Sequence, residues 1–155
     1  DGTAGIYIFT SNKKFYSLEP GNQVSIEGTL KYYNGLLEIT RFTDNAITVL
    51  SEGNIFSPYT ISLDKVSEET EGLYVKIENA EISFIDYNEN EKGYSVFITQ
   101  NGTVGEIRVD KYLESYPAPS SFKEGDVITV TGNVAQYYDS YQIMISSIED
   151  IEINN

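Results

Sequence analysis

The sequence predicts an all-β protein made of two tandem five-stranded barrels, the first lacking its N-terminal strand, with a short helix in the connector. Three observations lead to this prediction: an internal repeat, apolar residues at alternate positions, and turn residues between the alternating segments. With 155 residues, 40% of them hydrophobic and 13% aromatic, the chain is able to bury a core. We place the first unit at residues 1–61 and the second, beginning with the short helix, at residues 62–155.

The repeat emerges when the chain is shifted by 104 positions, which brings identical residues together without a gap. The identical pairs are Gly21 and Gly125, Gly28 and Gly132, Tyr33 and Tyr137, Ile39 and Ile143, and Ile47 and Ile151. Upstream, residues 2–5 match residues 102–105 at a shift of 100, so the second copy has extra residues in the loop between. Chance matching between two β segments is the alternative, but the shared strand pattern favours a duplicated unit.

Each copy contains one long strand with apolar residues or glycine at alternate positions. These are Val24, Ile26, Gly28 and Leu30 in the first copy, and Ile128, Val130, Gly132 and Val134 in the second. Alternate residues share one face of a strand, so this face is expected to be buried, and its glycine to mark a bend. A tyrosine-bearing turn follows at 32–35 and at 137–140, and then a return strand, which predicts a β-hairpin.

The remaining elements of the second copy follow from the same patterns. Strands are expected at 73–85, at 94–99 with 105–109 as its continuation or bulged partner, at 127–136, at 141–146 and at 148–153. Residues 62–69 predict one or two helical turns, with Ser62 as the cap. The first copy lacks everything that matches residues 73–100. Its open edge is expected to be covered, by a strand further upstream or by a neighbouring segment.

Composition excludes many kinds of active site. The chain has no Cys and no His, which removes disulfides, thiolate metal sites, the Cys nucleophile, the usual general base and the usual zinc ligand. No pair of carboxylates is singled out for acid–base chemistry. We therefore expect a protein that is not an enzyme and needs no cofactor.

Charge and hydropathy restrict the partners. With 24 acidic and 10 basic residues the formal net charge is -14, which repels polyanions and anionic membrane surfaces. No apolar run is long enough to cross a bilayer, so membrane insertion is not expected. The abundance of Tyr, Asn, Ser and Thr is typical of secreted or surface-exposed bacterial domains, and we expect an extracellular or cell-surface location. The opening residues favour a piece of a larger chain with further domains.

Several short motifs characterise the chain, and two of them have a match in the second copy. They are Gly-x-x-Gly-Ile at 2–6, Gly-x-x-Val-x-Ile-x-Gly-Thr at 21–29 and its match at 125–133, and the tyrosine turn with its return strand at 33–39 and 137–143. In these motifs the chain resembles the tandem OB-fold (oligonucleotide/oligosaccharide-binding) modules of secreted bacterial proteins, including those attached to extracellular nucleases. The resemblance implies a non-catalytic accessory module whose candidate ligand is single-stranded nucleic acid.

An OB barrel binds ligands on the outer face of its second and third strands and on the flanking loops. Nucleic-acid binding needs stacking aromatic rings beside cations. The candidate residues are Phe97, Arg108, Lys111, Tyr137, Tyr138 and Tyr141, with Tyr32 and Tyr33 in the first copy. Phe97 and Arg108 alternate out of the apolar face, so both are expected to point outward.

The alternative interpretation is that these tyrosines only cover half-exposed sheet. The net negative charge favours this alternative, because counterion release requires several Lys or Arg contacts. The chain would then be a protein- or glycan-interaction or spacer module without nucleic-acid binding.

A possible metal site lies in the loop after the first strand of the second copy. Asp86, Asn88 and Asn90 place oxygen atoms at alternate positions, as a calcium loop does. However, Glu91 stands at the sixth position, where the calcium loop has Gly, and Phe97 at the twelfth, where it has Glu. Residues of these types favour a tight turn without any metal, so none is expected, with calcium as the alternative.

Overall fold

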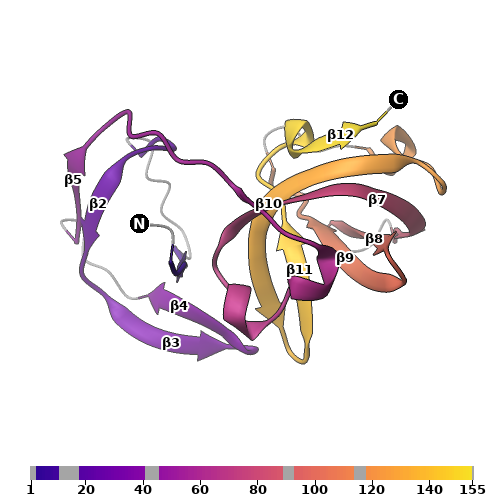
Figure 1. The fold of residues 1–155 in the computed structure, drawn as a ribbon. Helices are drawn as coiled ribbons and strands as arrows, with labels where there is room; N and C mark the ends of the chain where they lie inside the picture. The colour runs from indigo at the N-terminus through magenta and orange to yellow at the C-terminus, as the bar shows by residue number, and fades with distance from the viewer. Residues whose placement is uncertain (1–2, 11–17, 41–45, 89–92, 114–117, 155) are drawn as a thin grey trace.

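The computed structural model describes residues 3–10, 18–40, 46–88, 93–113 and 118–154. These residues form β-strands joined by turns and 3-10 helices, with no α-helix among them (Figure 1). The all-β class predicted from the sequence is therefore confirmed. None of the helical segments in the described ranges has the length and apolarity that crossing a membrane requires.

The second half of the chain forms one closed five-stranded barrel. Its strands are β7 (Tyr74–Asp86), β8 (Tyr94–Gln100), β9 (Thr103–Val109), β10 (Val127–Tyr137) and β11 (Ser140–Met144). They are paired in the order β10, β11, β9, β8, β7, and β7 also pairs with β10, which closes the ring. The β9–β11 pair is parallel and the other pairs are antiparallel. This arrangement is consistent with an OB-type barrel.

Branched aliphatic side chains that alternate along the strands fill the barrel. Those with at most 1% of their surface exposed are Val75, Ile77, Ile82, Val96, Ile98, Ile107, Val109, Ile128, Val130, Val134 and Ile143. Leu63 closes one end of the barrel, where a Cβ on Gly105 would lie only 2.5 Å from its Cδ1 atom. Glycine at 105 therefore makes room for Leu63.

The glycine in the long alternating strand, which was expected to mark a bend, lies where two strands approach closely. A Cβ on Gly132 would lie 2.6 Å from the carbonyl oxygen of Met144 and 2.7 Å from Cγ2 of Ile143. Strand β10 pairs with both β7 and β11 around this residue. Only a residue without a side chain lets β10 pass this close to β11 while it serves both neighbours.

Three details differ from the predicted elements. Residues 94–99 and 105–109 belong to two separate antiparallel strands, because Asn101 and Gly102 adopt positive φ angles of 52° and 82° and turn the chain. Residues 148–150 form the 3-10 helix η4 (Ile148–Asp150) rather than a strand. The strand β12 (Ile151–Ile153) that follows pairs with the edge of β10 outside the ring.

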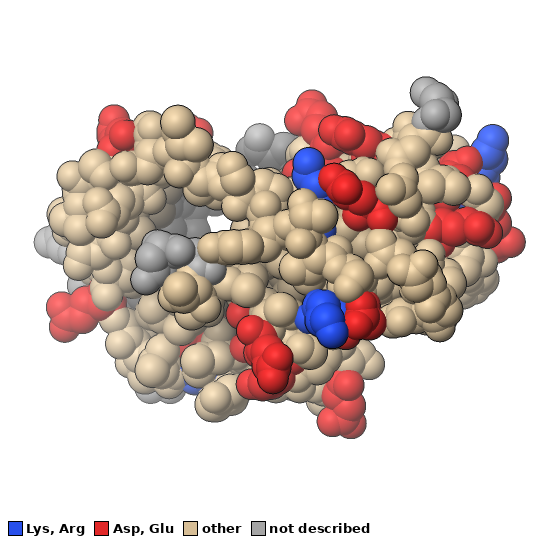
Figure 2. All heavy atoms as spheres, viewed as in Figure 1, with Lys and Arg blue, Asp and Glu red and all other residues tan. Residues whose placement is uncertain are grey.

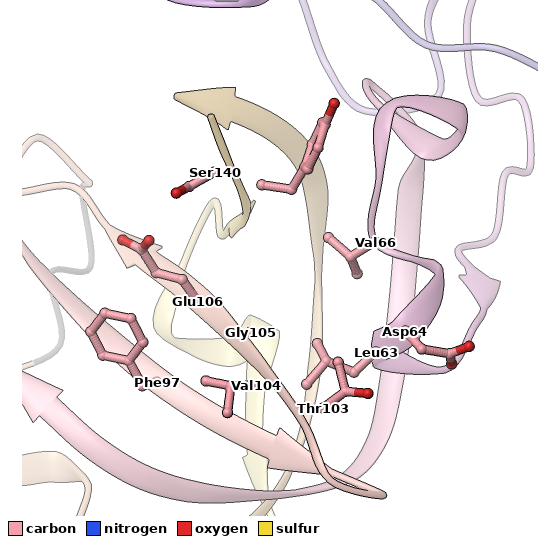
Figure 3. A pocket seen from close by; sticks show the side chains of 10 residues that line it. Leu63, Asp64, Val66, Phe97, Thr103, Val104, Gly105, Glu106 and Ser140 are labelled. Carbon is pink, nitrogen blue, oxygen red and sulfur yellow. The ribbon is translucent and has the colours of Figure 1, made fainter. Parts of the chain in front are cut away.

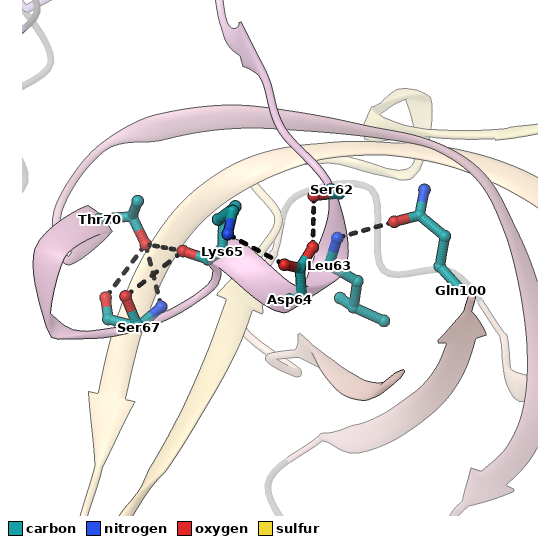
Figure 4. A network of polar contacts seen from close by, with 7 residues as sticks. All are labelled: Ser62, Leu63, Asp64, Lys65, Ser67, Thr70 and Gln100. Atoms are coloured by element: carbon teal, nitrogen blue, oxygen red, sulfur yellow. Dashed lines mark hydrogen bonds and ion pairs between the residues drawn. The ribbon is translucent and has the colours of Figure 1, made fainter. Parts of the chain in front are cut away.

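The predicted connector helix is present as two 3-10 helices, η1 (Leu63–Lys65) and η2 (Glu68–Thr70). Ser62 occupies the cap position of η1, but its hydroxyl donates to the Asp64 carboxylate instead of capping a backbone N–H. The Leu63 N–H donates to Gln100 Oε1 at 2.7 Å and so ties η1 to β8 (Figure 4).

The first half is an open arrangement of short strands. In one sheet β1 (Tyr7–Ile8), β4 (Leu36–Thr40) and β3 (Thr29–Tyr33) are neighbours, while β2 (Gln23–Ile26) pairs with β5 (Ile47–Ser51). Among the residues described up to 58, these strands do not close into a barrel, so a second barrel stays a prediction. Strand β6 (Tyr59–Thr60) pairs in parallel with β7 and thus joins the sheet of the second half.

Pairing registers in the two halves agree at the offset found in the sequence. Adding 104 to the pair Leu30–Ile39 gives Val134–Ile143, and adding 104 to Ile26–Ile47 gives Val130–Ile151; all four pairs are observed. Strand β1 is different, because Ile8 pairs with Ile39 as Ile107 pairs with Ile143. The offset between Ile8 and Ile107 is 99, whereas the sequence alignment of residues 2–5 with 102–105 gave a shift of 100. The structural offset places an apolar residue at both equivalent positions.

Substitution of Gly132 by Ala is expected to lower the free energy of unfolding by about 1–3 kcal/mol, the usual cost of overpacking a well-packed site. The new methyl group would contact backbone and side-chain atoms of β11 that cannot move independently. Urea denaturation measures the effect, with Thr131→Ala as the control on the adjacent, half-buried position. If the two variants are equally stable, the close approach of β10 and β11 is not what requires glycine.

Candidate ligand-binding face of the barrel

A hollow of about 330 Å³ lies over the outer face of β8 and β9, between η1 and the start of β11 (Figure 3). We call it the β8–β9 hollow. It is lined by Leu63, Asp64, Val66, Phe97, Thr103, Val104, Gly105, Glu106, Ser140 and Tyr141. The strands that form its floor are the second and third of the barrel, which is where OB barrels bind ligands.

Strand alternation places the floor residues. Val96 and Ile98 are buried inside the barrel, so Phe97 between them points to the outer face. Phe97 pairs with Glu106 across β8 and β9, and Ser95 pairs with Arg108 two residues further along. The sequence analysis expected Phe97 and Arg108 to point outward, and in the structure they lie on one face with Glu106 and Ser95 beside them.

Arg108 is engaged by its neighbours on this face. Its NH1 group donates to Ser95 Oγ at 3.4 Å, and the Ser95 hydroxyl donates to Glu106 Oε1 at 2.6 Å. Arg108 is half-buried, and it is not among the described residues that line the hollow. The polar groups presented to a ligand there are therefore carboxylates and hydroxyls rather than a cation.

The sequence analysis missed one aromatic residue of this face. Phe84 on β7 stacks on Phe97 with ring centroids 6.1 Å apart and an interplanar angle of 27°. Strict alternation from the buried Ile82 would put Phe84 inside, but the register shifts between these two residues and turns Phe84 outward, where half of its surface is exposed. Bulges of this kind leave no reliable signal in the sequence.

Tyr141 forms the wall of the hollow opposite the β8–β9 floor. Its hydroxyl donates to Glu68 Oε2 at 2.8 Å, which links β11 to η2. Desolvation, followed by this hydrogen bond and the charge of Glu68, raises the pKa of Tyr141 to about 12. The hydroxyl is thus held as a neutral phenol by Glu68.

The two tyrosine-bearing turns, treated separately in the sequence, meet in space. Gly35 pairs with Tyr137 as an isolated β-bridge, and the Tyr138 N–H donates to the Asn34 carbonyl oxygen at 2.6 Å. The contact brings together four exposed tyrosines, Tyr32, Tyr33, Tyr137 and Tyr138. The sequence predicts that these residues lie in turns but carries no signal that the turns touch.

Other predicted residues lie outside the hollow. Lys111 follows β9 in an exposed turn, with its Nζ 5.4 Å from the ring centroid of Tyr112. Asp86 ends β7 and Asn88 lies in the loop after it, while Asn90 falls outside the described residues. Within the described ranges no three acidic side chains are grouped to hold a metal ion. The calcium alternative remains a prediction.

Negative charge predominates on the surface around these residues. In Figure 2 acidic side chains are scattered over both halves of the visible face, and basic ones are few. Lys65, at the edge of the hollow, pairs with Asp64 at 3.1 Å. A ligand that depends on many free cations therefore finds little to bind on this face.

The two halves also meet at a buried carboxylate. Glu71 Oε1 accepts a hydrogen bond from the Leu37 N–H at 3.2 Å, while its Oε2 atom is buried without a hydrogen-bond partner. Burial raises the pKa of Glu71, the Leu37 hydrogen bond opposes that rise, and the charge of Glu68 adds to it. Burial and the charge of Glu71 together raise the pKa of Tyr7.

No protein-family model matches the chain, and no curated protein matches it. Among solved structures, the chain is similar to one described as the crystal structure of the p204 HINb domain. The two are 17% identical with a TM-score of 0.43, and the match covers 86% of this chain and 69% of that chain. The assignment of the barrel to the OB type rests on its own strand order and registers.

Glu71→Gln is expected to raise stability at pH 7, by on the order of 1 kcal/mol, because it removes a buried charge and keeps the acceptor for Leu37. Since burial raises the pKa of Glu71 in the folded state, the native protein loses stability as pH rises through that pKa. The difference between wild type and variant should therefore shrink below about pH 4.5, the ordinary value for Glu.

Thermal unfolding from pH 4 to pH 8 measures this effect. The exposed Glu69→Gln, on the same segment, controls for the change in net charge. A stability gain for Glu71→Gln that is the same at every pH would contradict the assignment of the effect to the Glu71 carboxylate.

Proposed function

We propose that the barrel is a non-catalytic binding module that takes an oligosaccharide in the β8–β9 hollow. One observation carries this proposal: the hollow combines the rings of Phe97 and Tyr141 with the carboxylates of Asp64 and Glu106, and none of its described lining residues is Lys or Arg.

Such a lining suits a neutral, hydroxyl-rich ligand. Pockets for small ligands commonly combine aromatic surface with a few polar groups that fix orientation. The apolar face of a sugar ring can pack on Phe97 while one of its hydroxyls donates to Glu106, and hydrogen bonds to an ionised acceptor are the stronger ones. Ser140 and Thr103 add hydroxyl partners at the rim.

Single-stranded nucleic acid is the second candidate. The stacked pair of Phe84 on β7 and Phe97 on β8, with Arg108 on the neighbouring strand β9, is the arrangement that favours it. Phosphates, however, would approach the carboxylates of the hollow on a chain of net charge -14. Without several cationic contacts, binding would have to come from stacking alone.

The wider role that we propose is that of an accessory module in a secreted or cell-surface bacterial protein with further domains. The absence of Cys and His supports a role without catalysis or cofactor. The common pairing registers of the two halves support two OB-type units in tandem. A protein partner in place of a glycan is compatible with the exposed tyrosines at the junction of the two turns.

Binding is tested by titrating the isotopically labelled chain, followed by NMR, with a panel of neutral oligosaccharides and with single-stranded oligonucleotides at low and high salt. We expect oligosaccharides to shift the signals of residues 97 and 104–106 without salt dependence. Phe97→Ala should weaken binding at least tenfold, about 1.4 kcal/mol. Tyr112→Ala, which removes an exposed ring outside the hollow, should leave the affinity unchanged.

The other outcomes are equally informative. Salt-sensitive binding of oligonucleotides alone would replace the proposal with the second candidate. Shifts confined to the tyrosine turns would place the site elsewhere, and no shift with either class would remove both ligands.

A further inference from the structure

Part of the inner face of the first half is exposed although its residues are of the core type. Leu30 has 63% of its surface exposed, whereas Val134, its equivalent at the offset of 104, has 0%. Ile8 has 37% exposed, whereas Ile107, which occupies the same register position, has 0%. The difference therefore lies in what covers these positions and not in the residues themselves.

The second half shows what the cover is. There β7 pairs with β10 and β8 pairs with β9, so the β7–β8 hairpin fills the space between β9 and β10. Among the described residues of the first half, β1 has no neighbour on the side opposite β4, and β2 and β3 have none opposite β5 and β4. Among the described residues, the first half thus lacks counterparts of both β7 and β8, which lie within the residues 73–100 that have no match in the first copy.

On the open edge of β2 and β3, every second residue directs its backbone N–H group away from β5 and β4. An added strand could accept hydrogen bonds from these groups. The Glu27 N–H donates to the Ala46 carbonyl oxygen on the β5 side. Successive residues of an antiparallel strand direct their N–H groups to opposite edges, so those of Ile26 and Gly28 face the open side. In the complete barrel the Val134 N–H, equivalent to that of Leu30, donates to the Leu73 carbonyl oxygen at 3.0 Å.

We propose that the seam between β1 and β2–β3 is a docking site for a β-hairpin from outside residues 1–155, which completes a second barrel by strand addition. Backbone hydrogen bonds to both free edges would hold the hairpin, and its inward side chains would cover Leu30 and Ile8. Those inward side chains should be Val or Ile, like Ile77, which pairs with Val130 at the position equivalent to Ile26, and Val96, which pairs with Ile107 at the position equivalent to Ile8.

The charge of the chain indicates which charged residues the docking hairpin should carry. Lys76 of β7 pairs with Thr131, and the equivalent of Thr131 at the offset of 104 is Glu27. A cationic residue at the matching place would lie opposite Glu27, where opposite charges on paired strands stabilise the pair. The net charge of -14 also favours an occupant that is not acidic. This proposal is independent of any ligand in the β8–β9 hollow.

Hydrogen–deuterium exchange of the complete chain tests the open seam. Amides in residues 6–9 and 23–30 should exchange at least tenfold faster than those in 105–109 and 127–134. Equal protection of both sets would show that the seam is already closed and would overturn the proposal. Protection that grows with protein concentration would assign the seam to a second copy of the chain and overturn it as well.

A fusion tests the occupant. A second copy of residues 73–100, the hairpin that fills the equivalent place, is joined through a flexible linker before residue 1. We expect residues 6–9 and 23–30 to become at least tenfold slower in exchange. No slowing in the fusion would overturn the proposal.

Two variants of the fusion establish that docking uses the inner face. Leu30→Lys should abolish the slowing, and because Leu30 is exposed in the chain without the hairpin, the unfused variant should keep its melting temperature. Ser25→Lys, on the opposite face of β2, should preserve the slowing. Slowing that survives Leu30→Lys would show that the hairpin binds elsewhere.

Discussion

Pairing of β7 with two neighbours, β8 on one edge and β10 on the other, is the constraint on which the barrel depends. It joins the first strand of the unit to a strand about 50 residues later, a closure whose entropic cost is recovered only when the inner side chains are buried together. In the first half, which is not closed among the described residues, Leu30 and Ile8 are exposed, whereas Val134 and Ile107 at the equivalent positions are buried. The apolar side chains are therefore buried because the β7–β10 pair closes the barrel, and apolar residue type alone is not sufficient.

The features predictable from the sequence are those with a local period. Alternation of apolar residues locates β10 and places Phe97 and Arg108 on one face, and the interior Gly132 marks the close approach of β11. Features that depend on register are not predictable. The bulge that turns Phe84 outward and the offset of 99 at β1 are set by backbone pairing between strands distant in sequence.

Of the candidate residues named from the sequence, Phe97 and Tyr141 line the hollow, whereas Arg108 donates to Ser95 beside Glu106. Their role in binding stays a prediction. Alternation along β9 already puts Glu106 and Arg108 on one face. The cross-strand register that brings Ser95 of β8 between them cannot be read from the spacing of residues.

The contact between the two tyrosine turns joins residues at equivalent positions of the two copies. Asn34 and Tyr138 occupy equivalent positions at the offset of 104, both adopt positive φ angles of 50° and 54°, and they are hydrogen-bonded to each other. A contact in which the same element meets its own equivalent resembles an isologous interface inside a single chain. The same substitution made in both turns would therefore alter both sides of this contact. Its effect on the stability of the contact would come from two positions.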